Sequence, residues 1–312
     1  MVFFTKNQTI TEEVIMSVED FIITVYCLVE ENLQKILDGA KLRQRGFKPH
    51  LSDGEMIAME IVAEFLGIDT DKGAWEYFSN HWQHWFPNLG SRANFAKHAA
   101  NLWSVKQALQ AELAKQMGAK SDTLHMADGF PIPICKFKRA NFSKVFSDSS
   151  AYGYCASKDE KYYGFKGNLL INSEGIISAI TVTAANIDER ESLWDLTAGI
   201  CGMIIADKGL VGADYQAELH KHTGINLQTS KRANMKETRS KKFLRWLVST
   251  RRLVETVIGQ LTERFHIEKV RARKVWYLTN RITRKILSHT VCVFINKLNG
   301  RPALQFENLI TA

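Results

Sequence analysis

The sequence predicts a protein in two parts: an all-helical front segment, and an α/β segment in which helices flank a mixed sheet. Its 312 residues are enough for about two domains of ~150 residues each. Before residue 119, apolar side chains recur only at helical spacing, whereas after Gly118 strand-like and helix-like segments alternate. We therefore expect a helical N-terminal domain over residues 1–118 and an α/β domain with C-terminal helices over residues 119–312.

The composition is that of a globular protein with a sizeable core. Hydrophobic residues make up 45% of the chain and charged residues 24%, as in an ordinary folded domain. No apolar run approaches the ~20 residues that cross a bilayer, and the first ten residues lack the apolar core of a signal peptide. The five cysteines are scattered without a C-x-x-C pair. We expect reduced thiols in a cytoplasmic protein, with neither disulfides nor a zinc site.

Four helices are predicted in the front segment. Ser17 is the expected N-cap of the first helix, and Ser52 with Glu55 three residues later is a capping box for the second. The second helix is expected to end at Gly67, a usual stop signal. The predicted helices run over residues 18–37, from Ser52 to about Leu66, from Asp71 onward, and from about Ser91 to Gly118.

The second segment is predicted to have the element order β-β-β-α-β-α-β-α. Gly129, Pro131 and Pro133 are expected to end the first strand, because proline interrupts a sheet ladder. Lys136–Lys161 has no clear period and is expected to be a long surface loop. The predicted strands are residues 123–128, 163–171, 176–183, 203–206 and 225–229, and the helices start at Asp188, cross Tyr215, and cover residues 240–264.

Two aspartates directly follow predicted strands. Asp128 comes after Leu124–Ala127, and Asp207 comes after Met203–Ala206. Ligand sites in open sheets with helical crossovers gather beyond the carboxyl ends of strands, so both side chains are placed to face a cleft. The competing interpretation is that each aspartate only caps a turn or a helix start, a common role for this residue.

Glu255 supports the interpretation that Asp128 and Asp207 belong to a ligand site. It lies on the polar side of the predicted helix over residues 240–264, beside an apolar stripe. Arg251 stands four residues earlier, and this order of base before acid stabilises a helix only weakly; the alternative is a plain surface ion pair. Three carboxylates from two strands and a helix would form a hard-oxygen cage for Mg²⁺ or Mn²⁺. Two such ions can promote phosphodiester cleavage.

The segments around these acids resemble known motifs. They are Ala127-Asp128-Gly129-Phe130-Pro131, Ala206-Asp207-Lys208-Gly209 and Arg251-Arg252-Leu253-Val254-Glu255-Thr256. They resemble the three acidic motifs of DDE transposases from bacterial insertion sequences, and most closely those of the insertion-sequence nine-eighty-two family. Segments 51–55, 75–78 and 81–87 are similar to the front half of that family, so the resemblance covers most of the chain.

The resemblance implies a ribonuclease H-like fold in which Asp128, Asp207 and Glu255 are catalytic and bind Mg²⁺ or Mn²⁺. It implies a DNA transposase that cleaves the terminal inverted repeats of an insertion sequence and transfers the 3′ ends to target DNA. It also implies a homodimer or larger synaptic complex, bound to the bacterial nucleoid. Two alternatives stay open: a ribonuclease H-like nuclease or resolvase without strand transfer, and a non-enzymatic DNA-binding protein.

The sequence departs from related insertion-sequence groups at two positions. Some of those groups have a tyrosine and a lysine flanking the glutamate, but Val248 and Thr262 stand at these spacings here. No role is therefore carried over to Val248 or Thr262. Arg251 does stand at the spacing of the arginine in those groups.

The charge is distributed unevenly along the chain. Residues 1–118 hold 11 basic and 15 acidic residues, a net −4, whereas residues 119–312 hold 30 and 18, a net +12. Residues 231–252 alone hold nine basic residues and one acid. This density favours contact with DNA phosphates; the alternative is a solvated helix face. The predicted DNA-binding residues are Lys231, Arg232, Lys236, Arg239, Lys241, Lys242, Arg245, Arg251, Arg252, Arg271 and Arg273.

Three further features have both a structural and a functional interpretation. The aromatic stretch Trp75–Phe86 could stack bases, but we expect it to form helical core. His125 and His266 lie near the acids in sequence, and we expect both to be structural. The front helices could recognise the DNA ends through a helix-turn-helix or could mediate dimerisation, and their net negative charge argues against the first role.

Overall fold

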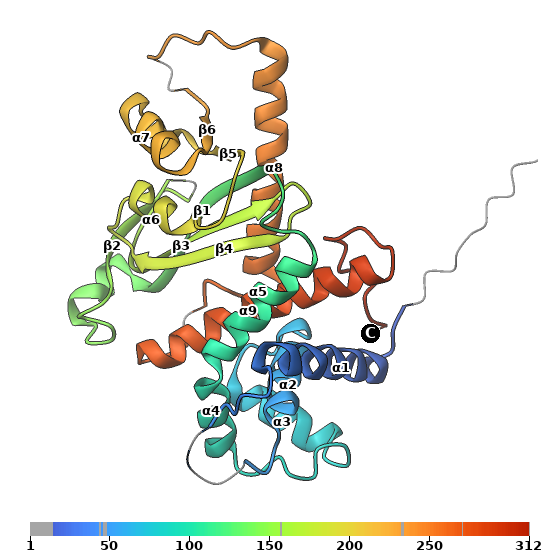
Figure 1. Cartoon of the computed structure of the whole chain (residues 1–312). Helices are drawn as coiled ribbons and strands as arrows, with labels where there is room; N and C mark the ends of the chain where they lie inside the picture. The colour runs from blue at the N-terminus through green and yellow to red at the C-terminus, as the bar shows by residue number, and fades with distance from the viewer. Residues whose placement is uncertain are drawn as a thin grey trace, which may run out of the picture.

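The computed structural model describes residues 15–43, 45, 49–156, 158–231, 234–269 and 271–311. Helices from both ends of the chain form a bundle, and a mixed sheet with its own helices lies next to it (Figure 1). Within these described ranges, no helix is both long and apolar enough to cross a membrane.

The front of the chain is helical, as the sequence predicts. Ser17 caps α1 by accepting a hydrogen bond from the backbone N–H of Asp20. Ser52 and Glu55 form the predicted capping box at the start of α2. Both caps satisfy N–H groups that have no partner inside their helix. The helices are α1 (Val18–Leu37), α2 (Asp53–Phe65), α3 (Asp71–His81), α4 (Arg92–Asn101) and α5 (Trp103–Gln116).

The prediction of one helix from Ser91 to Gly118 is wrong, because the chain breaks at Leu102 into α4 and α5. The N–H of Leu102 donates to the carbonyl of Ala99, three residues back, which is the tighter turn of a 3₁₀ helix. The Nζ of Lys106 donates to the same carbonyl at 2.9 Å. This fully buried lysine therefore helps to satisfy the helix end that the break exposes.

The second part of the chain is built on a six-stranded mixed sheet, counted over the described residues, with the order β2-β3-β1-β5-β6 and with β4 also paired to β3. β1, β3 and β4 are antiparallel neighbours, whereas β5 is parallel to β1 and β6 is parallel to β5. This arrangement is consistent with the expected ribonuclease H-like sheet. The strands are β1 (Leu124–Lys136), β2 (Ala151–Cys155), β3 (Glu160–Asn172), β4 (Ile177–Ala184), β5 (Met203–Ala206) and β6 (Asn226–Thr229).

Helices follow the strands in the predicted order. Asp188 caps α6, Gly224 ends α7 in a left-handed conformation, and Ser240 caps α8. Two 3₁₀ segments, η1 and η2, come after β1 and β5. The elements are α6 (Glu189–Leu196), α7 (Ala213–Thr223), α8 (Lys241–Glu263), α9 (Val275–Leu298), η1 (Phe137–Phe142) and η2 (Lys208–Leu210).

The prediction that β1 ends at Gly129 is also wrong, because β1 continues through Pro131 and Pro133 to Lys136. The pairing of β1 with β5 stops at Met126, so the later residues of β1 pair with β3 alone. Next to Gly164 of β3, the backbone groups of β1 are the carbonyl of Ile132 and the N–H of Ile134. The backbone groups of successive residues in a strand point to opposite sides. The nitrogen atoms of Pro131 and Pro133 therefore point away from β3, to the side on which this part of β1 has no paired strand, and no ladder hydrogen bond is lost.

Residues Lys136–Lys161 do not form one long loop, contrary to the prediction. The segment contains η1 and the strand β2, in which Tyr152 pairs with Tyr163 of β3. A strand of five residues is too short to show a clear period. It is defined by its pairing with β3, which no local pattern indicates.

The two faces of the sheet pack against different helices. Met126 and Ile205 belong to the core cluster that contains the buried face of α8, whereas their neighbours Ala127 and Ala206 belong to the cluster with α6 and α7. The predicted apolar stripe of α8 is buried, with Leu247, Val254 and Leu261 at 0% exposure. Because side chains alternate along a strand, this assignment determines which helix each following residue faces.

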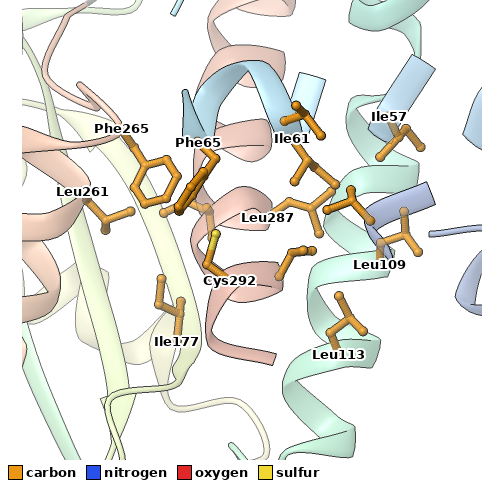
Figure 2. Close-up of a cluster of buried hydrophobic side chains, with 14 of the residues drawn as sticks. Ile57, Ile61, Phe65, Leu109, Leu113, Ile177, Leu261, Phe265, Leu287 and Cys292 are labelled. Atoms are coloured by element: carbon orange, nitrogen blue, oxygen red, sulfur yellow. The ribbon is translucent and has the colours of Figure 1, made fainter. Parts of the chain in front are cut away.

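One continuous apolar core joins the helical bundle to the sheet. Figure 2 shows Phe65 of α2 and Leu287 of α9 packed with Phe265, which follows α8, and with Ile177 of β4. Helix α9 follows the sheet in sequence but packs mainly against α2 and α5, which precede it. The first and last parts of the chain therefore build the same bundle.

Ionic side chains are buried inside this bundle. The Nε of Arg284 lies 2.5 Å from one carboxylate oxygen of Glu64, and the Nζ of Lys285 lies 2.6 Å from the other. Lys106 of α5 pairs with Glu60 of α2. All five side chains are at most 2% exposed. Buried charges are tolerated only when they are paired, and these pairs link α2 to α5 and to α9.

Candidate active site

The sheet register brings Asp128 and Asp207 next to each other. Strands β1 and β5 are parallel, and Met126 pairs with Ile205. Each aspartate lies two residues further along the chain, so both turn to the face of Met126 and Ile205, which is the face covered by α8. Asp207 directly follows β5 as predicted, whereas Asp128 lies within β1 rather than at its end.

Arg251 and Glu255 reach the same point from α8. The Nη2 of Arg251 lies 2.7 Å from Oδ2 of Asp128. Its Nη1 lies 3.0 Å from Oε1 of Glu255 and 3.8 Å from Oδ1 of Asp207. Arg251 and Glu255 therefore do form the ion pair that the alternative interpretation expects, but the same guanidinium also contacts both aspartates. The three predicted acids converge on one positive group.

Asp128 is the least exposed of the three carboxylates. Its side chain is 18% exposed, compared with 41% for Asp207 and 53% for Glu255. Burial is the main reason why the pKa of Asp128 rises from 3.8 to about 6; the charges of Asp207 and Glu189 also raise this pKa, while Arg251 and the N–H of Gly129 lower it. The charged form of Asp128 thus depends on a nearby cation.

A fourth carboxylate, Glu189, was not predicted. It is the first residue of α6 and lies against two glycines that follow the aspartates. A Cβ atom on Gly129 would lie 3.2 Å from Oε1 of Glu189, and one on Gly209 would lie 3.5 Å from its Oε2. The missing side chains therefore leave room for this carboxylate. An acid in the first turn of a helix is common for electrostatic reasons alone, so the sequence offers no signal for it.

A cavity of about 480 Å³ opens at these side chains. Both lysines that line it are already paired, Lys166 with Glu189 at 3.5 Å and Lys158 with Glu268 at 2.6 Å. The excess of acidic groups produces a negative potential that attracts cations. The acidic lining residues are Asp128, Glu189, Asp207, Glu255, Glu263 and Glu268, and the basic ones are Lys158, Lys166 and Arg251.

The donor set fits Mg²⁺ or Mn²⁺ in its chemistry, since it consists of carboxylate oxygens that already surround one positive group. In the part of the chain that the structure describes, no three His, Cys, Asp or Glu side chains are grouped so that they could hold a metal ion. In this arrangement the guanidinium of Arg251 stands between the carboxylates. A divalent ion can take the same oxygens only when Arg251 gives up its ion pairs.

The predicted DNA-binding residues do not form one surface. Lys241, Lys242 and Arg245 are exposed at the start of α8, and Arg252 is exposed in its middle. Arg271 and Arg273 follow the other end of this 23-residue helix, which is itself about 35 Å long at the usual rise per residue. Lys236 is exposed in the segment before α8, and Arg232 lies outside the described residues.

Arg251 is not the only predicted DNA-binding residue that has partners within the protein. Arg239 donates to the carboxylate of Glu237, to the side chain of Gln228 and to the carbonyl of Thr229. The Nη1 of Arg271 lies 3.2 Å from Oδ1 of Asp69. Lys231 donates to the carbonyl of Lys236 at 2.7 Å. Arg239 thus holds the segment before α8 against β6.

The two candidate histidines and the aromatic stretch have neighbours elsewhere in the fold. His125 is fully buried, with its Nε2 3.0 Å from the carbonyl oxygen of Ala119. The Nδ1 of His266 lies 3.4 Å from Oδ2 of Asp69, next to the front helices. In the aromatic stretch, Phe78, Trp82 and Phe86 are at most 8% exposed and belong to the core, whereas Trp85 is 37% exposed and α3 ends at His81, so the stretch is helical core only in part.

Comparison with protein families matches residues 118–275 to the family described as "Transposase DDE domain". The match covers half of the chain and includes the whole sheet, the three predicted acids and Arg251. No curated protein and no solved structure matches the chain. The mixed sheet flanked by helices is consistent with such a domain. On this match, the chain belongs to the transposase DDE domain family.

Proposed function

We propose that the chain is a DNA transposase that acts at the terminal inverted repeats of a bacterial insertion sequence. It cleaves a phosphodiester bond at each end and joins the freed 3′ end to target DNA. One observation supports this most: Asp128, Asp207 and Glu255 converge on a single guanidinium within the segment that matches the family. The resemblance to the insertion-sequence nine-eighty-two family is part of the same proposal.

Asp128, Asp207 and Glu255 are the residues that would hold the metal. A pair of Mg²⁺ or Mn²⁺ ions held there would activate the attacking oxygen and stabilise the leaving oxygen. Glu189 adds negative charge from the side of α6. Without Arg251, four carboxylates would share the site with little compensation, and this excess of negative charge favours the entry of a cation.

Arg251 has two roles in this proposal. In the structure it neutralises the acids and keeps them together. If a metal cation bound the three carboxylates instead, the guanidinium of Arg251 would become available to bind a phosphate oxygen of the DNA strand. Arginine suits both roles, because its planar fork of donors matches carboxylates and phosphates equally well and stays charged at any physiological pH.

Duplex DNA is proposed to lie along the exposed side of α8. Residues 241–252 carry five basic residues and no acid, and Lys241, Lys242 and Arg252 are exposed. Contacts with phosphates orient a duplex without reading its sequence. Because the same helix carries Arg251 and Glu255, this orientation brings the backbone of the DNA close to the acids.

The front helices are proposed to recognise the DNA ends or to hold two copies of the chain together. Strand transfer requires both ends in one complex, so we expect a homodimer or a larger synaptic assembly. Light scattering of the protein with an end duplex measures the mass of that complex. A strict monomer that binds both ends would contradict this expectation.

The function is tested with a labelled duplex that carries one of the inverted repeats flanking the coding sequence. We expect a nick at the repeat end in the presence of Mg²⁺ and none in EDTA, and we expect joined products when a target plasmid is added. Cleavage without joining would indicate a nuclease or resolvase. Binding without cleavage in Mg²⁺ would contradict both enzymatic functions and indicate a DNA-binding protein.

A further inference from the structure

A row of exposed aromatic side chains lies beside the candidate active site. It comprises Phe137 and Phe142 of η1 with Tyr152 and Tyr154 of β2, and we call it the aromatic edge. The exposed fractions of these side chains are 47%, 87%, 44% and 55%. Large aromatic side chains are mostly buried in folded domains. Four exposed rings on two neighbouring elements therefore indicate a surface that binds a ligand.

Two of these rings are in contact with each other, and Tyr152 also contacts a ring of the neighbouring strand. The ring centroid of Phe137 lies 5.2 Å from that of Tyr152, and Tyr152 lies 5.2 Å from the ring of Tyr163 on β3. Tyr152 and Tyr154 are two residues apart on one strand, so their side chains share a face. Tyr152 also donates its hydroxyl to the side chain of Asn141, the residue before Phe142. Tyr152 therefore connects β2 with η1, and the aromatic edge spans both elements.

Packing on the other face of β2 keeps the tyrosines pointing outward. Gly153 lies between them, and a Cβ atom at this position would be 2.7 Å from Cβ of Ala185 and 3.0 Å from the ring of Tyr162. The strand is thus pressed against the protein on the glycine side. β2 is also the edge strand of the sheet path, so the tyrosines lie at the margin of the fold.

Basic side chains flank the η1 end of the aromatic edge, while Tyr154 at the other end donates its hydroxyl to Asp159. Lys136, Lys138 and Arg139 are exposed on either side of Phe137, and the Nζ of Lys161 lies 5.9 Å from the centre of that ring. Residues 136–144 contain no acid. Cations next to exposed rings are the chemistry that binds single-stranded nucleic acid, because phosphates pair with the cations while bases stack on the rings.

The aromatic edge is continuous with the cavity at the acids. Tyr154 lines that cavity together with Asp128, Asp207 and Glu255. A DNA strand that leaves the acids in this direction meets the aromatic edge next. The bases of an intact duplex are already stacked on each other, so only unpaired bases are free to stack on these rings.

We propose that the aromatic edge binds unpaired nucleotides of the DNA next to the cleavage point, with bases stacked on Phe142, Tyr152 and Tyr154. The inference rests on the proposed transposase function and adds a second DNA subsite to it. Duplex phosphates lie on α8, and unpaired bases lie on β2 and η1. The two subsites use different residues, so they can be tested separately.

The test measures binding of fluorescein-labelled oligothymidine and of a blunt duplex by fluorescence anisotropy in EDTA, where no cleavage occurs. We expect Phe142→Ala and Tyr154→Leu each to weaken binding of oligothymidine by about fivefold or more. Binding of the duplex should stay within about twofold of the wild type, since phosphate contacts do not depend on these rings.

Two matched variants serve as controls. Tyr154→Phe keeps the ring and removes only the hydroxyl that donates to Asp159, so it should bind oligothymidine like the wild type. Tyr26→Leu removes a tyrosine on α1 that is 36% exposed, and it should also have no effect. A loss of binding in Tyr154→Phe equal to that in Tyr154→Leu would overturn stacking as the cause.

Other outcomes separate the inference from the proposed function. A wild-type chain that binds and cleaves the duplex but does not bind oligothymidine would overturn the aromatic edge and leave the transposase function intact. A chain that binds neither DNA would contradict both. Self-association that Phe142→Ala and Tyr154→Leu abolish, with oligothymidine binding unchanged, would show that the edge is a contact between copies of the chain.

Discussion

The guanidinium of Arg251 lies 2.7 Å from the carboxylate of Asp128, although 123 residues separate the two in the chain. The pair connects α8 to the sheet at the point where β1 and β5 carry their aspartates. The same guanidinium contacts Glu255, one turn further along α8. These contacts make the three acids a single electrostatic unit, and most of the expected effects of substitution follow from it.

Arg251→Gln should lower the stability of the metal-free protein and enlarge the effect of metal on it. Asp128 is mostly buried and loses its cation in this variant, which should cost about 1–3 kcal/mol in the free energy of unfolding. A divalent ion no longer competes with the guanidinium for the same oxygens. Thermal unfolding with and without Mn²⁺ should therefore show a larger metal-induced rise in Tm than in the wild type.

The control for this substitution is Arg252→Gln, which removes the exposed neighbouring arginine. It should leave both the Tm in EDTA and the Mn²⁺-induced shift close to those of the wild type. A smaller metal-induced shift in Arg251→Gln than in the wild type would contradict competition between the guanidinium and the metal.

Asp128 should make the stability of the metal-free protein depend on pH. Its pKa rises from 3.8 to about 6 on folding, so the folded state holds the proton more tightly than the unfolded chain does. Between about pH 4 and pH 6, stability therefore falls as pH increases. The full cost, present above about pH 6, is at most about 3 kcal/mol for a shift of this size.

Urea unfolding in EDTA across this window measures the effect, with Asp128→Asn as the reference because asparagine does not titrate. The free energy of unfolding of the wild type should decrease relative to that of Asp128→Asn as pH rises. Parallel pH profiles for the two proteins would mean that Asp128 keeps an ordinary pKa in the fold.

Reversing the charges of Lys241 and Lys242 should weaken binding to every DNA sequence by a similar factor. Both lysines are exposed at the start of α8, and phosphate contacts carry no sequence information. Each lost contact should also reduce the slope of log affinity against log salt concentration by about 0.9. Binding titrations with a repeat duplex and an unrelated duplex at several salt concentrations measure both quantities.

A matched control reverses the same amount of charge at Lys120 and Lys221, two exposed lysines outside α8 and outside the front helices, and it should leave duplex binding close to that of the wild type. If the variant at Lys241 and Lys242 lost affinity only for the inverted repeat, these lysines would be reading bases and not phosphates.

Arg284→Leu should strongly destabilise the helical bundle. Arg284 is 2% exposed and pairs with Glu64 and Asp71, so its removal breaks both pairs, although Lys285 still contacts Glu64. Breaking such a pair typically costs about 3–5 kcal/mol. Lys35→Leu, which breaks an exposed pair with Glu31 on α1, should cost at most about 1 kcal/mol. Urea unfolding measures the loss of stability in each variant. Similar losses in the two variants would contradict the expectation that a buried ion pair is more costly to break than an exposed one.

Elements that depend on local chemistry could be predicted from the sequence. The caps at Ser17 and Ser52 use side chains within three residues of the N–H groups that they satisfy, so a short window contains the whole interaction. The continuation of β1 through Pro131 and the existence of β2 depend on pairing with β3. These features require knowledge of which strands are neighbours, and no window of the sequence contains it.

The same distinction applies to the site. Asp128, Asp207 and Glu255 stand in short segments that resemble family motifs, and so they could be named. The contact of Arg251 with Asp128 and the approach of Glu189 to Gly129 arise only when α8 and α6 pack on the sheet. The sequence indicated which acids would meet, and the fold revealed the arginine that stands between them.

Cleavage of a labelled inverted-repeat duplex by Asp207→Asn in Mg²⁺ tests most directly whether the three acids act together on DNA. Asparagine keeps the shape of the side chain and removes its charge, so we expect no cleavage while the affinity for the duplex stays close to that of the wild type. Asp214→Asn, which changes an exposed aspartate on α7, should cleave normally. Normal cleavage by Asp207→Asn would contradict the proposed role of the acids.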